Sequence, residues 1–231
     1  MFSNPMYLLL IGPMLLAWLS QVKVRNIYKK FDEKPNNHGY RGTDIARRLI
    51  AHYGLAGITI EKTQGYLTDH YDSRANVLRL SDGVANGSSI TSLGIVAHEV
   101  GHALQEAEGY HFMRLRSMLA PRVAKITQWS SVAFIGGWLL GIPVLMALSA
   151  LIMAGMVVFS LVTLPVEKNA SDRALASLEM TGLAAGEERE GVKKVLRAAA
   201  FTYLAGFAQR FGRFLFYVLV IAMAKGFTSP L

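Results

Sequence analysis

The sequence lacks cysteine and has few charged residues. Because there is no cysteine, the chain can form no disulfide framework, zinc finger or iron–sulfur cluster, and any bound metal must be held by His, Asp or Glu. Charged residues make up 17% of the 231 residues, hydrophobic residues make up 52%, and mean hydropathy is +0.30. A soluble globular chain has roughly 25% charged residues. The composition therefore argues against a simple soluble enzyme and against disorder, and it favours a small domain with membrane spans.

Charge is absent from two long segments of the chain and scarce in a third. Residues 6–22 are uncharged, and no Lys or Arg precedes them, which predicts an uncleaved first span. The 41 uncharged residues after Lys125 are enough for two helices, and the breaker at 141–143 predicts a hairpin over 126–165. A shorter apolar run predicts a fourth span at 201–225. We therefore expect a mainly α membrane protein with about four transmembrane helices.

Basic residues flank the predicted spans on one side. They follow the first span and stand on both sides of the hairpin, whereas the N-terminal tail and the hairpin turn have none. By the positive-inside rule, residues 23–125 and 166–200 face the cytoplasm, and the N-terminus lies outside. The net charge of +8 then reflects membrane topology. No nucleic-acid partner is expected, because the basic residues form no recognition motif.

The segment 23–125 has the pattern of a small α+β domain. Alternating residues predict two short strands, at 58–60 and 76–80, which form either a β-hairpin or a pair of neighbouring strands. Ser88 or Ser89 can then cap a long helix. The segment 166–200 is expected to be a cytoplasmic helix.

The long helix contains the most specific pattern in the chain, an HExxH motif over residues 98–102. One helical turn separates His98 from His102, so both imidazoles project from the same face and can bind one zinc ion per chain. Glu99 lies beside them, where it can take a proton from a water on the metal. The alternative is two ordinary helix histidines. The apolar flanks argue against that interpretation, because unpaired polar groups would be costly there.

A catalytic zinc site usually has three protein ligands and one open position. The extended HExxHxxGxxH pattern fails here, because Gln105 and Glu108 occupy its last two positions. His111 could reach the metal only if the chain reversed sharply. Glu167 is the better candidate, because it is the first charged residue after the hairpin, and a carboxylate at the end of an apolar helix usually indicates function. A membrane-flank charge or an N-terminal helix residue remains the alternative for Glu167.

Further residues are candidates for transition-state stabilisation and substrate binding. His70 and Arg173 could each supply a second electrophile, and each could equally be a structural hydrogen-bonding residue. The strand over 77–80 is expected beside the motif helix, where an extended polypeptide substrate could pair with it as an added strand. The residues of this predicted substrate strand are Val77, Leu78, Arg79 and Leu80.

Several motifs occur together in one order: GYLTDHYD followed by NVLRLS, then HEVGHALQ, then LPVEKNAS after the hydrophobic hairpin, and TYLA near the last span. Over most of residues 40–205 the chain resembles bacterial membrane zinc metallopeptidases of the YugP type, which are similar to the HtpX and CAAX prenyl protease families. The resemblance implies that His98, His102 and Glu167 are zinc ligands and that Glu99 is the catalytic base. One position departs from the wider group: the Asp expected four residues after the third ligand is Ser171.

The resemblance also implies a fold, an activity and a location. The fold is a zincin-like cytoplasmic catalytic domain built on the HExxH helix. The activity is that of a gluzincin-like zinc endopeptidase acting on membrane or misfolded proteins, and the location is the bacterial inner membrane, crossed several times. The lipid bilayer and a polypeptide substrate are the expected partners, and the sequence identifies no membrane protein partner. A non-catalytic scaffold or chaperone-like protein, in which zinc only holds helices together, is the alternative function; a fourth protein ligand would favour it.

Overall fold

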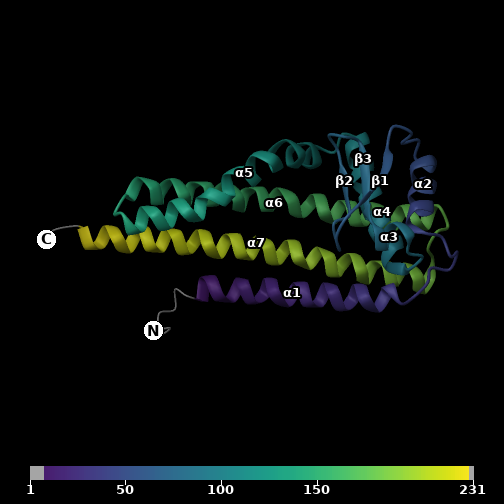
Figure 1. Ribbon diagram of the computed structural model, residues 1–231, viewed down its shortest axis with the longest axis horizontal. Coiled ribbons are helices and arrows are strands. Elements are labelled where there is room, and N and C mark those ends of the chain that lie inside the picture. Colours follow the sequence, from purple (N-terminus) through teal and green to yellow (C-terminus); the bar gives the residue numbers. More distant parts are fainter. Residues whose placement is uncertain (1–7, 229–231) are drawn as a thin grey trace. The chain divides into compact units, whose positions relative to one another are not determined.

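The computed structural model describes residues 8–228 as a mainly helical chain with one small sheet (Figure 1). Two expectations concern residues outside that range: the first two residues of the predicted 6–22 span, and the outward location of the N-terminus. The helices of the described chain are α1 (Leu8–Asp32), α2 (Gly42–His52), α3 (Asp82–Asn86), α4 (Ile90–Ala107), α5 (His111–Leu139), α6 (Pro143–Met180) and α7 (Gly186–Thr228).

The chain divides into two compact units. The first unit contains residues 115–164 together with the described parts of 1–21 and 202–231, and the second contains residues 22–114 and 165–201. The long apolar helices account for the first unit, whereas the sheet and the HExxH helix belong to the second. The predicted zinc motif therefore lies in the unit that has the character of a small α+β domain.

Three helices of the described chain are long and apolar enough to cross a membrane, judged by length and composition: α1, α6 and α7. Helix α5 is not among them. Its uncharged part runs from Ile126 to Leu139, which at 1.5 Å per residue is about 21 Å, whereas the hydrocarbon core is about 30 Å thick. The span expected in the first half of the 126–165 hairpin, which lies in α5, therefore remains a prediction.

Within the first unit, α5 and α6 form an antiparallel pair. The turn between them contains Gly141, whose φ of 64° lies in the left-handed region that glycine adopts easily. The Ser130 hydroxyl donates a hydrogen bond to the carbonyl of Ser149 at 3.2 Å. Phe134 of α5 stacks on Tyr217 of α7, with ring centroids 3.7 Å apart. Aromatic stacking and a satisfied hydroxyl thus join α5, α6 and α7 in this unit.

The sheet of the second unit consists of β1 (Thr59–Thr63), β2 (His70–Asp72) and β3 (Val77–Ser81), in the order β1-β3-β2. The strands β1 and β3 are parallel, and β2 is antiparallel to β3. The two strands predicted from the sequence are therefore neighbours and not hairpin partners. The hairpin partner of β3 is the three-residue strand β2, which is too short to give a periodic signal in the sequence.

The central position of β3 corrects the prediction that Val77, Leu78, Arg79 and Leu80 form a substrate strand. Both edges of β3 are already occupied, by β1 along its whole length and by β2 along most of it. Beyond the end of β2, the backbone N–H of Ser81 donates to the Asp69 carboxylate at 2.7 Å. A substrate backbone therefore finds no unpaired edge on β3.

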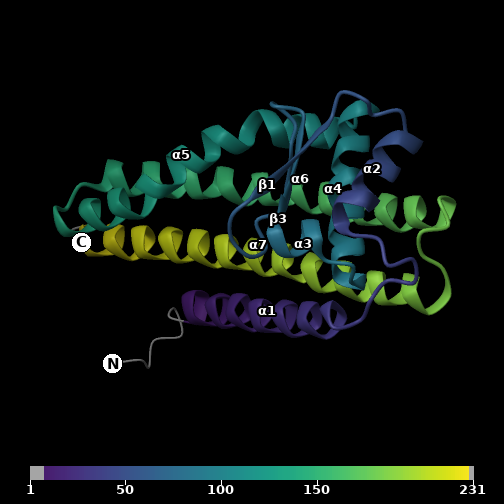
Figure 2. The same cartoon turned by 45° about the vertical axis from the view of Figure 1, so that its right-hand side comes forward.

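Helix α4 packs against β2, β3 and α2 in the second unit (Figures 1 and 2). The Ser89 hydroxyl caps it by accepting a hydrogen bond from the backbone N–H of Ser92 at 3.1 Å. Leu93, Val96 and Val100 are buried in one apolar core with residues of α2 and the sheet. The histidines and glutamate of the motif therefore lie in a helix that is buried along nearly its whole length.

The segment 166–200 differs from the single cytoplasmic helix expected for it. Helix α6 continues through Pro165 to Met180, and α7 begins at Gly186. Gly182, with a φ of 68°, lies in the turn that joins the two helices. The third predicted ligand, Glu167, is thus inside a long continuous helix and is followed by about three and a half more helical turns.

Candidate metal centre

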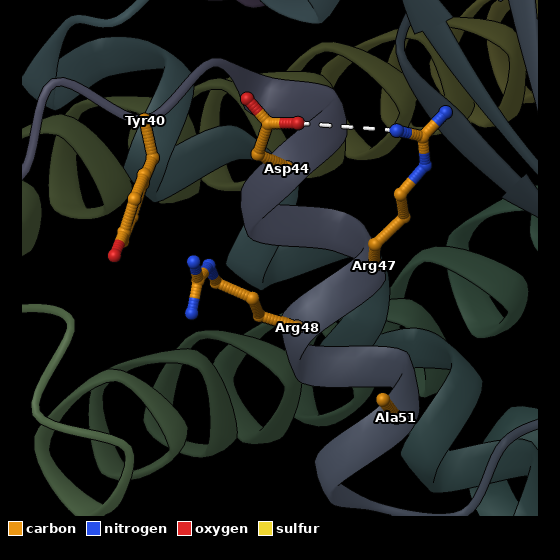
Figure 3. Close-up of a pocket in the computed structure, with 5 residues that line it drawn as sticks. All are labelled: Tyr40, Asp44, Arg47, Arg48 and Ala51. Atoms are coloured by element: carbon orange, nitrogen blue, oxygen red, sulfur yellow. Dashed lines mark ion pairs between the residues drawn. The ribbon is translucent and has the colours of Figure 1, made fainter.

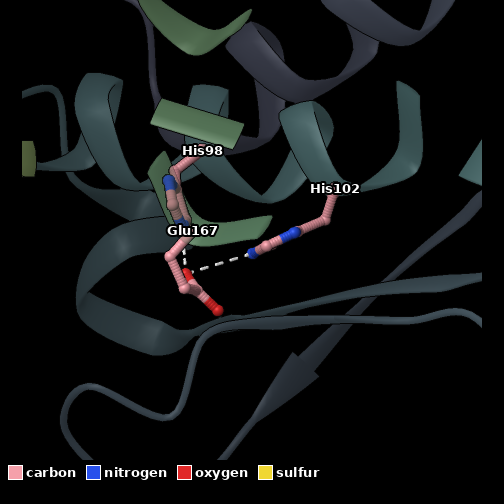
Figure 4. Close-up of side chains that lie close together, drawn as sticks. All are labelled: His98, His102 and Glu167. Carbon is pink, nitrogen blue, oxygen red and sulfur yellow. Dashed lines mark hydrogen bonds and ion pairs between the residues drawn. The ribbon is translucent and has the colours of Figure 1, made fainter. Parts of the chain in front are cut away.

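Two histidines of α4 and one glutamate of α6 converge (Figure 4). The Nε2 atoms of His98 and His102 lie 3.1 Å and 3.5 Å from the same oxygen of Glu167, Oε2. The exposed fractions of the three residues are 9%, 4% and 2% in that order. The structure therefore brings together the three side chains that the sequence singled out as zinc ligands.

A close approach of the two helices makes this meeting possible. A Cβ atom at Gly101 would lie 2.6 Å from the backbone oxygen of Ala170 on α6, a separation that side chains do not tolerate. Gly101 stands between the two histidines in sequence, and Ala170 lies one turn after Glu167. Glycine at position 101 therefore lets α6 come near enough for Glu167 to reach both imidazoles.

Each histidine has a hydrogen-bond partner on its other ring nitrogen. The Nδ1 atom of His102 lies 3.0 Å from Oε1 of Gln105, and the Nδ1 atom of His98 lies 3.2 Å from the Ser171 hydroxyl. Such contacts hold an imidazole in the orientation in which Nε2 can bind a metal. Ser171 thus contacts a candidate ligand from the position where the resemblance led us to expect an Asp.

Gln105 is the most connected of these partners. It is fully buried, and its Nε2 donates to the carbonyl of Val166 and to Oδ1 of Asn169, each at 2.9 Å. Because both acceptors belong to α6, the Gln105 side chain joins α6 to the imidazole of His102. The amide orientation is consistent: Nε2 faces two acceptors, so Oε1 faces the ring nitrogen.

The carboxylate of Glu99 is buried and held by a strand. Its Oε2 accepts a hydrogen bond from the backbone N–H of Tyr71 in β2 at 2.9 Å, and the residue is 8% exposed. This bond fixes a carboxylate next to the histidines and links β2 to the motif helix. An acidic side chain oriented in this way is suited to act as a general base.

The donor set of the cluster suits zinc. Two imidazole nitrogens and one carboxylate oxygen form a common set of protein ligands in catalytic zinc sites. Ligand atoms about 2.1 Å from a tetrahedral zinc ion lie about 3.4 Å from each other, and the two Nε2–Oε2 distances, 3.1 Å and 3.5 Å, are close to that value. All candidate ligand atoms lie within 4.8 Å of one another. The residues therefore fit a three-ligand zinc site.

The other candidates lie outside this cluster. His70 is exposed, and its Nδ1 lies 2.8 Å from the Thr68 carbonyl. Arg173 donates to Asn169 at 2.8 Å and to Glu108 at 2.7 Å, and this pairing lowers the pKa of the Glu108 carboxyl. In the structure both side chains have the hydrogen bonds of a structural residue, and their catalytic roles remain predictions.

Sequence reasoning missed three contributors to this site: Gly101, Gln105 and the backbone of Tyr71. A glycine inside an apolar helix is itself a signal, because glycine destabilises a helix interior by about 1 kcal/mol relative to alanine. A glutamine at a position that continues the buried face of α4 is another. The contact of Tyr71 leaves no such signal, because a backbone donor is common to nearly all residue types.

A separate hollow on the surface of α2 shares no residue with the cluster. It is lined by Tyr40, Asp44, Arg47, Arg48 and Ala51 (Figure 3). The Arg48 guanidinium lies 4.0 Å from the centre of the Tyr40 ring, and Arg47 and Asp44 form an ion pair at 3.9 Å. The two arginines are exposed, so the hollow does not have the buried polar groups of a built binding site.

Comparison with known proteins agrees with the geometry of the cluster. The family model described as "Putative neutral zinc metallopeptidase" matches residues 6–222. The chain is 40% identical over 197 residues to the "Putative membrane protease YugP" of Bacillus subtilis (strain 168), and the match covers 85% of this chain and 88% of that protein. No solved structure matches the chain.

Replacing the α6 carboxylate tests the third ligand. We expect Glu167→Ala to weaken zinc binding by roughly two orders of magnitude, because one of three ligands is lost. Glu179→Ala is the matched control, since Glu179 is also on α6 but pairs with Arg189 at the surface. Zinc titration with a competing chelator measures both. Equal affinity in Glu167→Ala and Glu179→Ala would exclude Glu167 as a ligand.

A second substitution tests the orientation of His102. Gln105→Leu keeps a side chain of similar size but removes the hydrogen bond to the imidazole, and we expect zinc affinity to fall about ten- to a hundredfold. The conservative variant Gln105→Glu retains an acceptor and should restore part of the affinity. The melting temperature of the zinc-free variants separates this effect from general destabilisation. Unchanged affinity in Gln105→Leu would show that His102 needs no such partner.

Proposed function

We propose that this chain, which belongs to the neutral zinc metallopeptidase family, is a membrane-anchored endopeptidase that hydrolyses peptide bonds at the α4–α6 cluster. The observation that carries the proposal is the arrangement of Glu99. This residue is buried, it is fixed by Tyr71 of β2, and it neighbours two histidines that both contact the Glu167 carboxylate. His98, His102 and Glu167 would hold one zinc ion. When bound there, zinc would make a water nucleophilic near neutral pH and would polarise the substrate carbonyl.

In this proposal Glu99 carries the proton. One oxygen, Oε2, is held by the Tyr71 backbone N–H, so the carboxylate does not rotate away, and the other oxygen would take the proton of the attacking water. The water oxygen adds to the carbonyl carbon, the C–N bond breaks, and Glu99 passes the proton to the leaving amine. His70 and Arg173 are retained as candidates for a second electrophile.

The same arrangement favours an enzyme over a zinc-stabilised scaffold. A scaffold needs only the ligands, whereas a further buried carboxylate that ligates nothing would reduce its stability. Glu99 is such a carboxylate: it is 8% exposed and does not belong to the three-residue cluster. A group of this kind is usually retained for chemistry.

We further propose that the protein is a multi-pass protein of the bacterial inner membrane, with its active site in the cytoplasm and its N-terminus outside. The basic flanks of α1, α5 and α6 support this orientation under the positive-inside rule. A total of four spans would require the short apolar part of α5 to cross the membrane together with α6 as a hairpin. Membrane or misfolded proteins are the proposed substrates, because an active site beside a bilayer meets such chains first.

Glu99→Gln tests the catalytic proposal. The amide keeps the shape of the side chain but cannot accept the proton at neutral pH, so we expect zinc content to stay at about one ion per chain and cleavage of unfolded casein to fall by about 100-fold or more. Zinc analysis and a casein assay on the detergent-solubilised protein measure the two properties. Casein cleavage at the wild-type rate by Glu99→Gln would refute the proposed role of Glu99.

A further inference from the structure

A small cavity opens beside the C-terminal half of α4. Its volume is about 230 Å³, and its walls come from α4, from β2, from the turn that joins β2 to β3, and from the loop that joins α2 to β1. Ligand pockets for drug-sized molecules usually measure about 300–1,000 Å³. A cavity of this size suits a single amino-acid side chain. Leu55, Ile58, Ala103 and Ala107 supply the apolar part of its wall.

The cavity adjoins the proposed catalytic group through Tyr71. The backbone N–H of Tyr71 holds Glu99, while the same residue lines the cavity. The Tyr71 hydroxyl donates to Asn76, whose Nδ2 donates to the Gly57 carbonyl at 2.9 Å. Asn76 and Gly57 also line the cavity, so this wall is fixed by hydrogen bonds. A substrate whose backbone is bound beside Glu99 could therefore place one of its side chains in the cavity.

Glu106 supplies the charge of the cavity. It follows His102 by four positions and Glu99 by seven, so the three side chains lie on one face of α4 at successive turns. Of the described residues that line the cavity, Glu106 is the only one with a formally charged side chain. Its Oε2 atom is buried and accepts no hydrogen bond from any described residue. A buried carboxylate oxygen without a donor is costly, which indicates that a bound ligand provides one.

We propose that this cavity is a substrate subsite for a lysine or arginine side chain, with Glu106 as the specificity-determining residue. The aliphatic stem of the side chain would pack on Leu55, Ile58 and the alanines, and its cationic end would reach Oε2 of Glu106. The inference rests on the proposed peptidase function. It adds the class of substrate to that function: polypeptides with a basic residue at one fixed position near the cleaved bond.

Cleavage of a mixed peptide pool tests the subsite. The metal-loaded full chain in detergent is incubated with peptides that retain internal Lys and Arg, and mass spectrometry identifies the cut sites. We expect basic residues to be enriched at one position within a few residues of the cut. In Glu106→Lys that enrichment should be replaced by one for Asp and Glu, because the charge of the subsite is reversed. Cut sites with no basic enrichment in the wild type would overturn the proposal.

A matched pair of peptides measures the size of the preference for lysine. In one cleaved peptide the selected lysine is replaced by norleucine, which keeps the stem and lacks the ammonium group. We expect kcat/KM for the lysine peptide to exceed that for norleucine by roughly tenfold or more, as for a hydrogen bond between charged groups. In Glu106→Gln the ratio should approach one, whereas Glu179→Gln, a surface control, should keep it. A ratio that is unchanged in Glu106→Gln would overturn the assignment of Glu106.

A binding measurement separates this proposal from the peptidase function. The Glu99→Gln protein is titrated with fluorescent versions of two library peptides that differ only in lysine or norleucine, and the Kd ratio is compared with that of Glu99→Gln/Glu106→Gln. If the wild type cleaves no peptide, but the tighter binding of the lysine peptide depends on Glu106, the subsite holds and the peptidase function fails. Cleavage without any lysine preference leaves the peptidase function and removes the subsite, and the absence of both cleavage and preference refutes both proposals.

Discussion

The contact between α4 and the C-terminal part of α6 at Gly101 is the constraint on which the candidate metal centre depends. No side chain fits between the Gly101 Cα and the Ala170 carbonyl, and this close approach sets where Glu167 lies relative to the two histidines. Glycine in a helix interior is unfavourable by about 1 kcal/mol relative to alanine. The packing of two buried helix faces offsets that loss. The position of the third candidate ligand is therefore a consequence of backbone packing.

Several polar groups lie at this buried contact between the two helices. His98, Glu99, His102, Gln105 and Glu167 are all buried, and leaving such groups without partners would cost several kcal/mol. The chain satisfies them locally, through Gln105 to α6, through Ser171 to His98, and through Tyr71 to Glu99. Metal at the cluster would neutralise the Glu167 carboxylate as well. A core built in this way sacrifices stability for a fixed constellation of donors, as functional sites commonly do.

The sequence predicted the parts of the site that follow from helical periodicity and from chain order. A spacing of four places His98 and His102 on one face, and the polarity pattern after the hairpin identified Glu167. Features that depend on tertiary pairing could not be predicted from the sequence. Because β2 has only three residues, the order β1-β3-β2 could not be foreseen, and the substrate strand assigned to β3 was wrong. The continuity of α6 through Pro165 was also missed, because the boundary at 165 followed the end of the uncharged run, and a helix can continue past such a change in composition.

The central claim is that two helices present three ligands and leave one position of the metal open beside Glu99. X-ray absorption spectroscopy of the full chain loaded with one zinc ion tests it most directly, together with a zinc-bound crystal structure that identifies each ligand. The account predicts four-coordinate zinc with His98, His102, Glu167 and one solvent molecule within about 2.0–2.2 Å. A fourth protein ligand that closes the site, or zinc bound without Glu167, would contradict it.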